Sequence, residues 1–84
     1  MNKLDNYRAK IDDIDFEIIK LLEERFKVVE KIKEYKYVND LNVRDYNREL
    51  VIIDKIKSYN LEKEKEIIDV YKDIFKVSKK AQEK

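Results

Sequence analysis

Residues 4–35 read LDNYRAKIDDIDFEIIKLLEERFKVVEKIKEY, and this stretch decides the fold. Its apolar residues recur at alternating steps of three and four, which is the pattern of an a/d seam on an α-helix. This first seam comprises Leu4, Tyr7, Ile11, Ile14, Ile18, Leu21, Arg25, Val28, Ile32 and Tyr35. The pattern predicts a single helix over about residues 4–37, roughly 50 Å long.

A second apolar seam runs beside the first and comprises Ile19, Leu22, Phe26 and Val29. Polar residues extend it at the same spacing, with Arg8, Asp12 and Asp15 before it and Lys33 and Lys36 after it. Two adjacent seams on one long helix imply packing on two sides, more than an 84-residue chain can provide alone. We therefore expect a second copy to supply part of the packing, giving an intertwined helical homodimer.

The rest of the chain predicts an all-α fold. The sequence contains no glycine and no proline, the two residues on which the turns of sheet proteins draw most heavily. Its length has room for one domain, which we assign to residues 1–84. Three helices are expected, one long and two shorter, over about residues 4–37, 43–59 and 61–82.

The links between these helices are short and polar. Asn39 is expected to take the left-handed conformation that ends the first helix, in place of the usual glycine. Asn42 and Asn60 are expected to cap the second and third helices.

Composition excludes several classes of function. A net charge of +1 gives no reason to expect a nucleic acid or an anionic membrane as partner. Cysteine and histidine are absent, so the chain lacks disulfides, thiolate nucleophiles, and the most common metal ligand and general base. No metal site is expected. Without an apolar run of membrane-spanning length or a signal-peptide core at residues 1–5, the expected location is the cytoplasm.

Polar residues that interrupt the apolar faces are the candidates for function. Sixteen lysines accompany only four arginines, so arginine is used sparingly. Arg25 lies in the first seam, and Arg8 and Lys36 lie near the two ends of the second. Ser78 and Gln82 continue the apolar stripe of the third helix. Because guanidinium groups match carboxylates in a bidentate fashion, this set predicts a site for a small molecule bearing carboxylates.

Helix geometry constrains that site. Arg25 and Lys36 are eleven residues apart, so they point the same way at about 16 Å. Arg8 and Arg25 are seventeen residues apart, about 25 Å along a straight helix, which one small ligand cannot bridge. If Arg8 belongs to the site, it comes from an antiparallel second copy. Each residue also has a structural interpretation: an a-position arginine can set register, and the Ser78–Gln82 pair can be the fraying end of a helix.

Five blocks of sequence, taken together, resemble the all-helical class of chorismate mutases over about residues 4–82. The block YRAKIDDID at 7–15 is similar to the family's L-R-x-x-I-x-x-x-D, and LLEER at 21–25 to its L-L-x-x-R. Tyr35-Lys36 follows. VRDYNRE at 43–49 is similar to V-x-D-x-x-R-E, and SKKAQ at 78–82 to S-x-x-x-Q. The first linker departs from the family because it lacks the glycine and proline often found there.

The resemblance implies a cofactor-free rearrangement of chorismate to prephenate, in the biosynthesis of phenylalanine and tyrosine. Arg25, with Arg8 from the partner subunit, would hold the two substrate carboxylates, assisted by Ser78. Lys36 and Gln82 would donate hydrogen bonds to the ether oxygen whose bond breaks. Such a reaction requires orientation and positive donors rather than a nucleophile, in agreement with the composition.

The remaining matched residues open the second helix. The resemblance implies that Glu49, with the backbone near Asp45, holds the ring hydroxyl and that Arg48 supports this polar group. Taken alone, the three would be ordinary helix-start charges. Two alternatives stay open. One is an isochorismate–pyruvate lyase on the same scaffold, and the other is a helical dimerisation module without a ligand.

Overall fold

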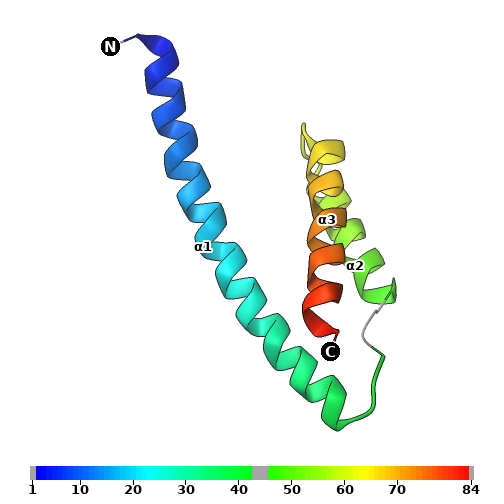
Figure 1. Cartoon of the computed structure of the whole chain (residues 1–84). Helices are drawn as coiled ribbons and strands as arrows, with labels where there is room; N and C mark the ends of the chain where they lie inside the picture. Colours follow the sequence, from blue (N-terminus) through cyan, green and yellow to red (C-terminus); the bar gives the residue numbers. More distant parts are fainter. Residues whose placement is uncertain (1, 43–45, 84) are drawn as a thin grey trace.

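The computed structural model describes residues 2–42 and 46–83 and contains three helices, α1 (Lys3–Val38), α2 (Tyr46–Ser58) and α3 (Glu64–Gln82) (Figure 1). No strand occurs within these two ranges. The prediction of an all-α fold with one long and two shorter helices is confirmed. The expected start of the second helix, at 43–45, lies outside the described residues.

Helix α1 is uninterrupted over 36 residues. It begins after Asn2, whose side-chain oxygen accepts a hydrogen bond from the backbone N–H of Asp5 at 2.8 Å and so satisfies one of the free N–H groups of the first turn. The prediction for its C-terminal end is wrong by one residue. Asn39 has φ −100° and donates its side-chain amide to the carbonyl of Tyr35, whereas Asp40 takes the left-handed conformation at φ 55°. Aspartate tolerates that region better than most residues other than glycine.

The prediction that Asn60 caps α3 is also wrong. Asn60 takes a left-handed conformation at φ 53° just after α2, and its N–H bonds back to the carbonyl of Lys57. Helix α3 begins only at Glu64, and Lys63 at its N-cap makes no side-chain capping bond. Glu64 and Glu66 in the first turn place negative charge at the positive end of the helix. Asn60 therefore serves the end of one helix rather than the start of the next.

Helix α3 packs against both other helices. Figure 1 shows α2 and α3 side by side and antiparallel, while only the C-terminal half of α1 approaches α3. The buried apolar core of the described residues is small and takes one side chain from each helix, Val29, Ile56 and Phe75. The molecule is correspondingly elongated, with extents of 56 × 25 × 15 Å.

The N-terminal half of α1 diverges from the other two helices (Figure 1), and the apolar residues of the first seam on this half are uncovered. We call the uncovered part the open face of α1: Leu4, Tyr7, Ile11, Ile14, Ile18 and Leu21, each between 48% and 59% exposed. A continuous apolar stripe of this kind is a mark of an interaction surface. Within the described ranges, no helix is both long enough and apolar enough to cross a membrane.

Candidate active site

A hydrogen bond between α1 and α3 anchors the candidate site. One terminal guanidinium nitrogen of Arg25 donates to the hydroxyl oxygen of Ser78 at 2.8 Å, across 53 residues of sequence. Ser78 is only 7% exposed. Arg25 reaches it because the arginine replaces an apolar residue in the seam of α1 at the level where α3 packs against that helix. Hydrogen bonds to a charged group contribute about 1.5–3 kcal/mol, so this contact fixes the direction of the guanidinium.

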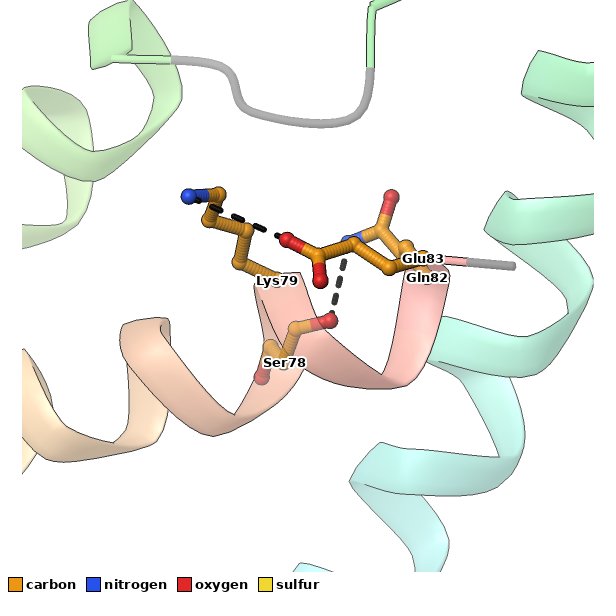
Figure 2. A network of polar contacts seen from close by, with 4 residues as sticks. All are labelled: Ser78, Lys79, Gln82 and Glu83. Atoms are coloured by element: carbon orange, nitrogen blue, oxygen red, sulfur yellow. Dashed lines mark hydrogen bonds and ion pairs between the residues drawn. The ribbon is translucent and has the colours of Figure 1, made fainter.

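Gln82 lies one helical turn beyond Ser78 on the same face of α3. Its amide nitrogen donates to the backbone carbonyl of Ser78 at 3.3 Å, a long bond (Figure 2). Its Oε1 is buried and has no hydrogen-bond partner among the described residues. An unsatisfied buried acceptor costs about 1–3 kcal/mol, so this conformation of Gln82 is held weakly.

A pocket of about 510 Å³ surrounds these residues and takes side chains from all three helices. This volume suits a small organic ligand. The polar residues that line it are Arg25, Lys36, Arg48, Glu49, Ser78, Lys79 and Gln82. The apolar residues are Val28, Val29, Ile32, Ile52 and Phe75. Among the described residues that line it, four cationic side chains against one carboxylate give the pocket a positive character, which favours an anion with more than one negative charge.

Six of the eight residues predicted for the site therefore line one pocket, although they come from three different helices. The spacing on each helix accounts for this. Arg25, Val29 and Lys36 recur at steps of four and seven and so share a face of α1. Phe75, Ser78 and Gln82 do the same on α3, in steps of three and four. The packing of these two faces encloses the pocket.

The other two predicted residues are Arg8 and Asp45. Arg8 is exposed on α1 and does not line the pocket. Because α1 is continuous between Arg8 and Arg25, the separation of about 25 Å stands. Asp45 lies outside the described residues. Lys79 lines the pocket, but sequence reasoning did not single it out, because it begins the lysine-rich C-terminal tail.

A second hollow of about 550 Å³ adjoins the first at the C-terminal end of α1. Lys36 and Gln82 line both hollows and so form the wall between them. The remaining lining residues are Glu30, Lys33, Glu34, Tyr37, Asp40 and Leu41. Across residues 2–42 and 46–83, no three acidic side chains are gathered closely enough to hold a metal ion.

The three helices enclose a small cationic pocket, which defines a class of all-helical domain whose pocket suits a compact polycarboxylate. Comparison with known families narrows this class. The family model described as chorismate mutase type II matches residues 7–83, and the chain belongs to this family. The family predicted from the five sequence blocks is thus confirmed.

The curated relatives are larger proteins. The chain is 40% identical over 67 residues to a bifunctional chorismate mutase/prephenate dehydratase of Buchnera aphidicola subsp. Acyrthosiphon pisum (strain APS), covering 75% of this chain and 17% of that protein. It is 38% identical over 55 residues to a protein of the same description from Buchnera aphidicola subsp. Schizaphis graminum (strain Sg), covering 66% and 14%. The chain thus spans about a sixth of the length of these relatives. No solved structure matches it significantly.

Proposed function

We propose that this chain is a chorismate mutase that converts chorismate to prephenate in the biosynthesis of phenylalanine and tyrosine. The observation that carries the proposal is the single pocket lined by six residues of the expected catalytic set, with Arg25 bonded to Ser78 inside it. Family membership supports the same activity. In this proposal the 84 residues act as one catalytic domain in the cytoplasm.

The reaction needs no covalent catalyst. An ether C–O bond breaks while a C–C bond forms within one molecule, so the enzyme must hold the compact reactive conformer and stabilise the charge that develops on the ether oxygen. In our assignment, the guanidinium of Arg25 grips one carboxylate, and Ser78 presets its direction. The ammonium of Lys36 and the amide N–H of Gln82 donate to the ether oxygen.

Gln82 must reorient for this role, because its amide nitrogen donates to the carbonyl of Ser78 in the structure. This change costs little free energy, because the bond to Ser78 is long and Oε1 has no hydrogen-bond partner among the described residues. On α2, Glu49 accepts a hydrogen bond from the ring hydroxyl of the substrate, together with the backbone near Asp45. Arg48 supports this polar group and adds positive charge. Glu49 and Arg48 line the pocket, and Asp45 lies outside the described residues.

The second substrate carboxylate requires Arg8 from another chain. Support comes from the open face of α1, which leaves an apolar stripe uncovered on the same half of the helix as Arg8. An antiparallel partner helix would cover this stripe and bring its own Arg8 toward Arg25. We propose a homodimer with two such shared sites.

The direct test is turnover by the purified protein. Incubation with chorismate is expected to yield prephenate, identified by its acid-catalysed conversion to phenylpyruvate, and Lys36→Met is expected to abolish the reaction. A parallel incubation with isochorismate tests the lyase on the same scaffold. Salicylate and pyruvate from isochorismate, without prephenate from chorismate, would overturn the proposal, and so would no product from either.

A further inference from the structure

Among the described residues that line the pocket, Lys79 is the one cationic side chain that the proposed mechanism does not use. It lines the pocket next to Ser78 and its side chain is 43% exposed. We propose that Lys79 binds a carboxylate of the substrate, and that Glu83 is the counter-ion which this carboxylate displaces. This inference rests on the proposed function, because it assigns an additional substrate contact to the same site.

The ion pair supports exchange of this kind. The ammonium of Lys79 lies 3.8 Å from a carboxylate oxygen of Glu83, the residue that follows the end of α3. Figure 2 shows the side chains of Lys79, Gln82 and Glu83 extending to the same side of this helix. Both partners are about half exposed, and such i,i+4 pairs contribute only about 0.3–0.5 kcal/mol. Glu83 therefore holds the lysine near the pocket without competing strongly with a ligand.

The surroundings favour a ligand carboxylate over Glu83. A bound dianion would already be held by Arg25 and Lys36, so a further contact with Lys79 costs little additional ordering entropy. The charge of the dianion also faces several cations at once. A partly exposed lysine at the side of a pocket attracts and holds an anion but does not reach the breaking bond. The effect of Lys79 is therefore expected in KM rather than in kcat.

The next residue provides a matched control. Lys80 is also on α3 and carries the same charge, but it is exposed and does not line the pocket. Lys79→Met is expected to raise KM for chorismate roughly three- to fivefold with kcat little changed, as for loss of a partly solvated ion pair. Lys80→Met is expected to leave both constants near wild type, and Lys79→Arg to restore KM.

A double-mutant cycle tests the role of Glu83. Glu83→Gln removes the competing carboxylate and is expected to lower KM in the wild-type background, but to have a smaller effect in Lys79→Met. A KM for Lys79→Met equal to that of Lys80→Met would overturn the inference while leaving the mutase activity intact. A purely structural ion pair would lower the melting temperature without moving KM, which would also overturn it. Absence of turnover by the wild-type chain would overturn the proposed function, and the inference with it.

Discussion

Arg25 is expected to lower the stability of the fold while serving the candidate active site. It occupies an a position of the first seam, where an apolar side chain would contribute burial energy, and its described hydrogen-bond partner in the chain is a neutral hydroxyl. A partly buried charge is costly to keep unless an opposite charge lies close to it. An arginine at this position is explained if a carboxylate of the substrate binds its guanidinium.

Replacing Arg25 by methionine separates these two roles. Arg25→Met is expected to reduce kcat/KM by several orders of magnitude, while the melting temperature stays the same or rises, because a thioether packs well in an apolar seam. Circular dichroism melting and the chorismate assay measure the two effects. A clear drop in melting temperature would instead identify Arg25 as a structural residue.

Ser78 is expected to act through Arg25. Ser78→Ala removes the acceptor of the 2.8 Å bond and leaves the guanidinium free to rotate, so KM should rise about tenfold, as for loss of one hydrogen bond to a charged group. In the Arg25→Met background the same change should have little further effect on activity. Equal effects of Ser78→Ala in both backgrounds would show that Ser78 does not act through Arg25.

Gln82 allows a test through protonation. A neutral amide donates at every ordinary pH, so the wild-type reaction should vary little around neutrality. Gln82→Glu introduces a carboxyl group that donates only when protonated and that, once ionised, opposes the negative charge developing on the ether oxygen. The variant should be most active in acid and lose activity as pH rises. A fully active variant with a flat profile would show that Gln82 does not contact the reacting oxygen.

At the scale of the helix, periodicity explains why so much was predictable. The spacing of apolar residues on α1 specifies both its length and the face it presents, and the same spacing placed Arg25 and Lys36 on one side. Helix ends were harder to predict. Because the chain has no glycine, Asp40 and Asn60 take the left-handed conformation after α1 and α2. The apolar periodicity does not indicate which of several neighbouring polar residues will do so.

The same limit applies to Lys79. A lysine in a lysine-rich tail looks like any solvated charge, and only the packing of α3 against α1 shows that it lines the pocket.

Arg8 is the opposite case. Its spacing from Arg25 predicted that the two could not share a site within one chain, and the continuous α1 keeps them apart.

The open face of α1 should behave as an interface. Ile14 lies on this face at 53% exposure, whereas the neighbouring Asp13 points to the other side of the helix. Ile14→Gln should weaken self-association at least about a hundredfold, because two symmetric copies each lose the burial of one isoleucine. Asp13→Gln should not. Sedimentation velocity over a dilution series measures both, and equal behaviour of the two variants would exclude this face as the interface.

At the scale of the whole molecule, the elongated shape and the small core both indicate that the chain depends on association with a second copy. The three buried apolar side chains among the described residues are a small core for extents of 56 × 25 × 15 Å, and much of the apolar surface of α1 is exposed. Chains near this length often depend on association to bury enough surface. A homodimer would complete the core and the active site in one step.

The measurement that tests this account most directly mixes two inactive variants. Arg8→Ala and Arg25→Ala are each expected to lack activity alone. A heterodimer of the two carries one site with both arginines intact, so an equilibrated equal mixture, with half of its dimers mixed, should recover about a quarter of wild-type activity. Tagged chains and native mass spectrometry confirm that mixed dimers have formed. Mixed dimers without activity would contradict the shared site.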